Sequence, residues 1–127
     1  MIVLDTHAWV WWAAASPRLS VAARRAIDSA DEIGVSVISC WEVAMAVAKG
    51  RLTFDREPLA WLREATRQPR VEMISISAEI AVLSTTLPGF HGDPADRLIV
   101  ASALDRAAPL ATMDRSIRRW KGVSTVW

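Results

Sequence analysis

The chain has 127 residues, of which 52% are apolar, and its mean hydropathy is +0.20. This length suits one domain with its own core and is too short for two ordinary domains. Fifteen Lys and Arg residues against fourteen Asp and Glu residues leave a net charge of +1, so the overall charge does not indicate a nucleic-acid-binding protein. The high apolar content predicts a sheet buried on both faces and an apolar surface covered by a partner, and we expect an oligomer.

The cysteine content and the first residues bear on the compartment. A single cysteine, Cys40, excludes an intrachain disulfide and is typical of a reducing compartment. Asp5 and His7 interrupt the first apolar stretch, and no positively charged leader precedes it. The sequence therefore predicts neither a signal peptide nor a membrane-spanning helix, and we expect a cytoplasmic protein.

The expected strands are short apolar runs separated by helices with recognisable ends. We expect strands at residues 1–4, 33–38, 71–76, 109–112 and 123–126. We expect helices at residues 8–15, 21–30, 40–49, 58–66, 78–86 and 94–104, and a last helical turn opened by Asp114. Alternating strands and helices indicate parallel pairing through right-handed crossovers. The predicted fold class is α/β, a three-layer α/β/α sandwich with a central, mainly parallel sheet, in one domain spanning residues 1–127.

Two of these helices carry more specific expectations. The helix at 40–49 is apolar on all sides, which predicts a central buried helix, and Ser39 with Glu42 fits a capping box that would start it. In the helix at 58–66, Leu59 and Leu62 are expected to face inward. Trp9, Trp11 and Trp12 of the first helix cannot all face one core, so one or two of them are expected on a partner surface.

Four carboxylates recur at equivalent places in this pattern: Asp5, Glu42, Asp96 and Asp114 follow a strand or begin a helix, with Asp93 close by. Each has a local alternative as a helix cap. The carboxyl ends of parallel strands share one edge, however, so all of these acids can meet in one crevice. Clustered carboxylates repel each other, and a divalent cation relieves the repulsion. Oxygen ligands without Cys or His favour Mg²⁺ or Mn²⁺, and Mg²⁺ commonly binds phosphate oxygens as well, which indicates phosphate chemistry.

Several stretches together carry a family resemblance. They are Val3-Leu4-Asp5-Thr6-His7, Ser39-Cys40-Trp41-Glu42 continuing to Lys49-Gly50-Arg51-Leu52, His91-Gly92-Asp93-Pro94-Ala95-Asp96-Arg97-Leu98-Ile99, and Pro109-Leu110-Ala111-Thr112-Met113-Asp114. In this order, over essentially the whole chain, they resemble a PIN-domain ribonuclease. More narrowly, the chain is similar to the VapC-type toxins of toxin–antitoxin pairs.

The resemblance implies a Mg²⁺-dependent endoribonuclease that acts on RNA, usually forms a homodimer and is silenced by a cognate antitoxin. Asp5, Glu42, Asp96 and Asp114 match the family's acidic metal site, with Asp93 as an auxiliary acid. In this interpretation Asp5 and Asp96 hold the principal ion, Glu42 binds it directly or through water, and Asp114 serves a second ion or positions the nucleophile. The hydroxyls of Thr6 and Thr112 would orient these acids. The RNA phosphates would be bound by Arg97, Arg115, Arg118 and Arg119.

Two other classes of function remain open. The first is a regulatory or phosphatase domain that is phosphorylated on Asp5, although His7 stands where a haloacid-dehalogenase-like site would have a second aspartate, and Thr112-Met113-Asp114 where a receiver would have its lysine. The second is a catalytically silent partner-binding domain whose acids are only helix caps. RNA cleavage that depends on Mg²⁺ and on Asp5 distinguishes the first interpretation from both.

Overall fold

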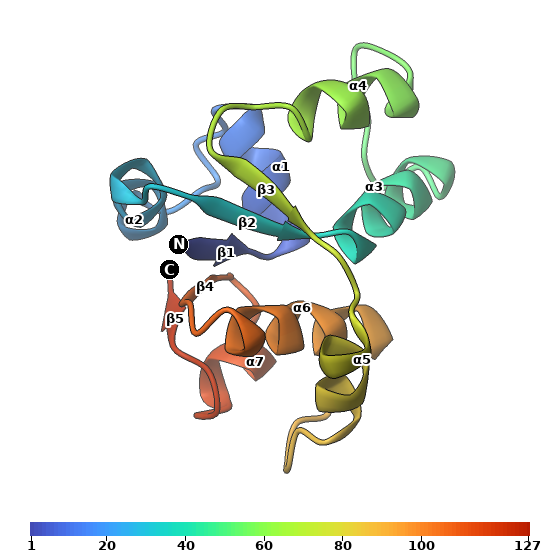
Figure 1. Ribbon diagram of the computed structural model, residues 1–127. Helices are drawn as coiled ribbons and strands as arrows, with labels where there is room; N and C mark the ends of the chain where they lie inside the picture. Colours follow the sequence, from blue (N-terminus) through green and yellow to red (C-terminus); the bar gives the residue numbers. More distant parts are fainter.

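A five-stranded sheet lies at the centre of the computed structural model, which describes residues 1–127 (Figure 1). Its order is β3-β2-β1-β4-β5, and every neighbouring pair is parallel. The strands are β1 (Ile2–Leu4), β2 (Ile33–Ser36), β3 (Val71–Ile74), β4 (Leu110–Ala111) and β5 (Thr125–Val126). All carboxyl ends therefore lie at one edge, as the parallel arrangement predicted.

Seven helices cover the two faces of this sheet. They are α1 (Thr6–Ala13), α2 (Val21–Ser29), α3 (Ile38–Ala48), α4 (Pro58–Ala65), α5 (Ala78–Thr85), α6 (Pro94–Asp105) and α7 (Arg115–Arg119). In Figure 1, α1 and α4 lie in the upper part of the view, α2 at the left, α3 at the right beside the carboxyl edge, and α5, α6 and α7 in the lower part. The longest helix has 12 residues, and no helix has the length and apolar character needed to span a membrane.

An apolar core lies between the sheet and the helices on each of its two faces, because successive side chains of a strand point to opposite faces. Ile2 and Leu4 of β1 belong to the core beneath α1 and α2, whereas Val3 belongs to the core that includes Ile99 and Ile117. All three side chains of β1 are at most 2% exposed. The predicted three-layer α/β/α sandwich is confirmed.

The start of α3 differs from the expectation. The backbone of Val37 is already helical, so β2 ends at Ser36 and α3 begins at Ile38, before the expected helix. Ser39 consequently lies inside the first turn, and no side chain caps this helix. The predicted capping box of Ser39 and Glu42 is wrong, because Ser39 is not the residue that precedes the helix.

The burial of α3 and α4 also corrects the sequence analysis. Only Ser39 and Val43 of α3 are buried and Trp41 is 55% exposed, so α3 is not a central buried helix. In α4, Leu59 is 57% exposed, and the buried positions are Trp61 and Ala65. The inward face of α4 is set by Trp61, whose larger apolar surface is buried instead.

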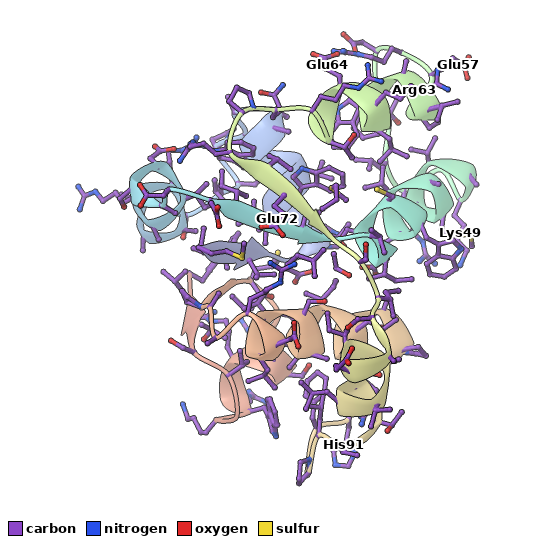
Figure 2. All side chains as sticks on the ribbon, viewed as in Figure 1. Lys49, Glu57, Arg63, Glu64, Glu72 and His91 are labelled. Atoms are coloured by element: carbon purple, nitrogen blue, oxygen red, sulfur yellow. The ribbon has the colours of Figure 1, made fainter.

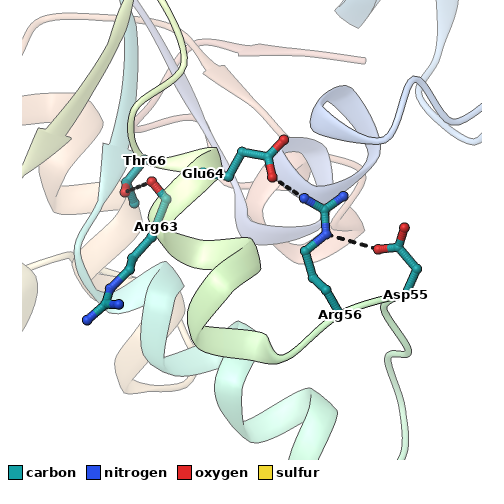
Figure 3. Close-up of polar contacts among 5 residues, drawn as sticks. All are labelled: Asp55, Arg56, Arg63, Glu64 and Thr66. Atoms are coloured by element: carbon teal, nitrogen blue, oxygen red, sulfur yellow. Dashed lines mark hydrogen bonds and ion pairs between the residues drawn. The ribbon is translucent and has the colours of Figure 1, made fainter.

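Aromatic and ionic contacts attach α4 to the rest of the molecule. Trp61 stacks on Phe54 with ring centroids 4.3 Å apart and meets Trp9 edge-on at 5.3 Å. On the outer side, Arg56 contacts both Asp55 and Glu64 (Figure 3). The surface ion pairs contribute little to stability, so the aromatic contacts are the main attachment of α4.

Candidate active site

Asp5 lies at the carboxyl end of β1, where it is the N-cap of α1 and only 6% exposed. Both of its oxygens accept hydrogen bonds: Oδ1 from the backbone N–H of Thr6 at 2.6 Å and Oδ2 from the hydroxyl of Thr112 at 2.6 Å. Burial raises the pKa of Asp5, although the bonds from Thr112 and Thr6 act to lower it. The side chain is thus a fixed, desolvated carboxylate at the centre of the sheet edge.

Glu42 reaches the same place from α3. Its Oε1 accepts a hydrogen bond from the hydroxyl of Thr6 at 2.6 Å, which connects the start of α1 to the second turn of α3. Partial burial is the main cause that raises the pKa of Glu42, and the negative charges of Asp5 and Asp93 add to it. Glu42 therefore faces the other acids, which the capping-box interpretation did not predict.

Asp93 and Asp96 come from the start of α6. Asp93 is the N-cap, and its Oδ1 accepts a hydrogen bond from the backbone N–H of Asp96 at 2.8 Å. The pKa of Asp96 is raised to about 7, first by partial burial and then by the charges of Asp93, Asp5, Asp114 and Glu42. Asp96 thus experiences the charge of Asp93 at the start of its own helix and of three carboxylates from other parts of the fold.

Asp114 follows β4 and caps α7. Its Oδ1 accepts hydrogen bonds from the backbone N–H groups of Ser116 at 2.8 Å and Ile117 at 3.1 Å, and from the Ser116 hydroxyl at 2.6 Å. Partial burial acts to raise the pKa of Asp114, but these bonds outweigh it, and the net pKa is lowered. The backbone N–H of Asp114 also donates to the Thr112 hydroxyl at 3.0 Å, so Thr112 connects Asp114 to Asp5.

The donor chemistry of this crevice fits a hard divalent cation. The acids supply only oxygen ligands, and their mutual repulsion is what such an ion would relieve. No three His, Cys, Asp or Glu side chains are gathered closely enough to form a metal-holding group in the present arrangement. The charges of the five acids act on one another at the carboxyl edge of the sheet, and we refer to this place as the acidic crevice.

The hydroxyl groups near the acids include one that the sequence analysis missed. Thr6 and Thr112 bond to Glu42 and Asp5, as expected for orienting groups. Ser39 was assigned to a helix cap, yet it is fully buried, with its Oγ 2.9 Å from Oγ1 of Thr6. The signal was its position three residues before Glu42, which places both on one helix face once α3 begins at Ile38.

The arginines that were expected to bind RNA differ in their contacts and exposure. Arg97 donates from Nε to the carbonyl of Ser84 and from Nη1 to that of Phe90, both at 2.7 Å, and these bonds attach α6 to the end of α5 and its loop. This geometry argues against a phosphate-binding role for Arg97. In contrast, Arg115, Arg118 and Arg119 are exposed on α7, next to Asp114.

The two histidines lie in different surroundings. His7 is exposed at the start of α1, and its charge acts to lower the pKa of Asp5, Glu42 and Asp114. His91 lies exposed in the connection between α5 and α6, at the bottom of the view in Figure 2. Of the two histidines, His7 is the one whose charge acts on Asp5, Glu42 and Asp114.

Comparison with known proteins identifies the family to which the chain belongs. The family model described as the PIN domain matches residues 2–123. The chain is also 39% identical to the protein named ribonuclease VapC22 from Mycobacterium tuberculosis, over 99% of this chain and 98% of that protein. The chain belongs to the PIN domain family, as a VapC-type protein.

Solved structures give the same fold for this PIN-domain chain. VapBC2 from Rickettsia felis, bound to a DNA fragment from its promoter, matches with a TM-score of 0.70 and 20% identity, over 98% of this chain and 97% of that chain. DNA-bound VapBC from Salmonella typhimurium matches with a TM-score of 0.71 and 17% identity, over 98% and 95% of the two chains. At these identities the likeness establishes the PIN fold.

Proposed function

We propose that the chain is a metal-dependent endoribonuclease that hydrolyses RNA phosphodiester bonds, with Mg²⁺ as its cofactor and Mn²⁺ as a possible substitute. The observation that carries this proposal is the convergence of five acids on one crevice, expressed in the pKa of about 7 of Asp96. The relative named ribonuclease VapC22 supports RNA as the substrate. We further propose that residues 1–127 act as one nuclease domain.

Each acid would have a role in metal binding that follows from its surroundings. Asp5 and Asp96 would hold the principal ion, since Asp5 is fixed by two hydrogen bonds and the pKa of Asp96 is raised to about 7 by burial and by the charges of the other four acids. Glu42 would bind directly or through water. Asp114 would bind a second ion or position the attacking water, and Asp93 would add charge. The bound ion supplies a charge that stabilises the phosphate oxygens and a water that is more easily deprotonated.

RNA would approach this crevice along α7. Arg115, Arg118 and Arg119 are exposed on that helix, and Asp114 is its N-cap. Phosphate contacts of this kind release counterions and make binding weaker at higher salt. Replacing Arg118 and Arg119 together with Gln should raise KM and flatten its dependence on salt, with little change in kcat.

Asp5 phosphorylation is a poorer explanation of the site. Asp5 is only 6% exposed, and His7 and Thr112-Met113-Asp114 stand where such sites would have a second aspartate and a lysine. Helix capping alone is also insufficient. Although Asp5, Asp93 and Asp114 do cap helices, Glu42 and Asp96 cap nothing and still face the crevice.

We also propose two protein partners, a second copy of the chain and a cognate antitoxin. The structural neighbours named above are VapBC complexes, which supports the antitoxin. The apolar surface for these partners includes Trp41, 55% exposed on α3, and Val82, 64% exposed on α5. Trp41→Ser should lower the mass measured by light scattering if this surface joins two copies, and an unchanged mass would count against it.

Trp11 and Trp12, each half-buried on α1, are our candidates for antitoxin contact, and their truncation should weaken that complex.

The function is tested by incubating purified protein with total cellular RNA, with Mg²⁺ or with a chelator. The Asp5→Asn variant removes a proposed ligand, and Asp31→Asn makes the same change at an exposed acid near the opposite, amino edge of the sheet. We expect discrete fragments from wild type and Asp31→Asn in Mg²⁺ only. Equal inactivity of folded, antitoxin-free wild type and Asp5→Asn would refute the proposal.

A further inference from the structure

Ser39 is a buried residue of α3 whose hydroxyl is hydrogen-bonded to Thr6 and to none of the acids. The side chain is 0% exposed, and its Oγ lies 2.9 Å from Oγ1 of Thr6. Thr6 in turn lies 2.6 Å from Oε1 of Glu42 and is 8% exposed. Ser39 and Glu42 are one helical turn apart on α3, so this helix contacts the same Thr6 hydroxyl at two points.

The number of protons sets the direction of these two hydrogen bonds. A hydroxyl has one proton to donate and can accept through its lone pairs, whereas an ionised carboxylate can only accept. The single proton of Thr6 must therefore go to Glu42. Ser39 must then be the donor in its contact with Thr6, and the bonds run from Ser39 to Thr6 to Glu42.

This direction gives the Ser39 hydroxyl a definite effect. With a donor on its other side, the Thr6 hydroxyl cannot rotate without losing a buried hydrogen bond, and its proton stays aimed at Glu42. The backbone N–H of Thr6 is bonded to Asp5 at the same time. Thr6 therefore holds an acid of α3 and an acid of β1 in a fixed relation, and Ser39 holds Thr6.

We propose that Ser39 is a positioning residue, whose buried hydroxyl orients Glu42 toward the acidic crevice by donating to Thr6. This inference rests on the proposed function for what Glu42 does, but the positioning itself can be measured without activity. Groups that orient metal-binding side chains typically affect metal affinity by 10–100-fold. Because Ser39 acts through one intermediate, we expect an effect of about tenfold, at the lower end of that range.

The variants are chosen so that folding and positioning separate. Ser39→Ala removes the donor, and Ser39→Thr retains it. Ser102→Ala is the matched control, since Ser102 is also 0% exposed but donates to the Leu98 carbonyl of its own helix at 2.7 Å. Thr6→Val removes the intermediate group, so Ser39→Ala can be tested with and without it in a double-mutant cycle.

Two measurements compare these variants with the wild-type protein. Mn²⁺ affinity is measured by electron paramagnetic resonance, and the ¹³C resonance of the Glu42 carboxyl is measured by NMR without metal, at one fixed pH, with its assignment taken from Glu42→Gln. We expect Ser39→Ala to weaken Mn²⁺ binding about tenfold and to shift the Glu42 resonance. Ser102→Ala should do neither, Ser39→Thr should restore both, and Ser39→Ala should add nothing to Thr6→Val.

The inference is overturned if Ser39→Ala matches Ser102→Ala in the Glu42 resonance, or if its full effect persists in the Thr6→Val background. Failure of the proposed function looks different. In that case wild type binds no Mn²⁺ and cleaves no RNA, while the Glu42 resonance still decides whether Ser39 positions it.

Discussion

Asp96→Asn should stabilise the metal-free protein at neutral pH. The unfolded chain releases the Asp96 proton near its ordinary pKa of 3.8, whereas the folded protein keeps it until about pH 7. The folded state therefore binds more protons between these values, and the free energy of unfolding falls as the pH rises from about 4 to about 7 and is constant above that. An amide at position 96 has no charge to desolvate or repel, so the fall in the free energy of unfolding with rising pH should disappear.

The size of the effect follows from the same pKa. A shift of this size corresponds to about 4 kcal/mol at about 1.4 kcal/mol per pKa unit. Since Asp96 is only partly buried, solvent screening reduces this to about 2 kcal/mol. For a domain of this length, that is a rise in the unfolding midpoint of about 6–8 °C.

The assay is thermal unfolding followed by circular dichroism in chelator, at intervals between pH 4.5 and pH 8.5. Wild type and Asp31→Asn should lose stability with rising pH, while Asp96→Asn should show a flatter profile and unfold at higher temperature at pH 8. The reasoning is refuted if Asp96→Asn retains the wild-type pH profile or is less stable than wild type at pH 8. Adding Mg²⁺ should stabilise wild type more than Asp96→Asn, because the ion relieves the same repulsion.

Substitutions at three further positions test hydrogen bonds at the site and at the end of α2. Thr112→Val removes the hydroxyl that donates to buried Asp5, and it should lower the free energy of unfolding in urea by about 1–3 kcal/mol; an unchanged midpoint would contradict the role of this bond. Asp114→Ala should lose about 0.5–2 kcal/mol with the cap of α7, whereas Asp114→Asn should keep most of that stability in thermal unfolding and still lose Mg²⁺-dependent cleavage. Arg70→Met removes donors to the carbonyls of Ile27 and Ala30 at the end of α2, and a loss of about 1 kcal/mol in thermal unfolding is expected with no change in cleavage; reduced cleavage would show that α2 affects the site.

Local signals made much of the fold predictable from the sequence. Ser20, Ser77 and Asp93 directly precede the helices expected at residues 21–30, 78–86 and 94–104, and each accepts a hydrogen bond from the first turn that follows it. The run before Asp5 is apolar without alternation, and its three strand residues are buried on both faces. These features depend on a few neighbouring residues, so the sequence is sufficient to predict them.

The errors occur where tertiary packing decides. Val37 and Ile38 are β-branched and follow a strand, so they resemble its continuation, yet both have left the strand and Ile38 begins α3. The apolar composition of α3 could not distinguish burial inside the chain from exposure toward a partner. In α4, either Trp61 or Leu59 could face inward, and the contacts of Trp61 with Phe54 and Trp9 place Trp61 on the inner face.

The site likewise has features that the sequence predicts and features that depend on tertiary packing. The convergence of the acids could be predicted, because parallel topology alone brings strand ends together. The bonds from Thr112 to Asp5 and from Thr6 to Glu42 join residues 107 and 36 positions apart, and only the resemblance to PIN-domain proteins had indicated those threonines. Ser39 was missed because its role depends on the true start of α3. Arg97 was expected to bind RNA phosphates, and no sequence pattern indicated its bonds to Ser84 and Phe90.

The most direct test of the ribonuclease assignment is reversible metal dependence in a single sample. An end-labelled RNA fragment cleaved by wild-type protein is followed on a gel while chelator is added and Mg²⁺ is then restored in excess, with Asp5→Asn run in parallel. We predict that cleavage by wild type stops with chelator and resumes at the same positions with Mg²⁺, and that Asp5→Asn yields no fragments at any stage. Cleavage that continues in chelator, or that Asp5→Asn performs equally well, would contradict the assignment of these carboxylates to a metal-dependent nuclease.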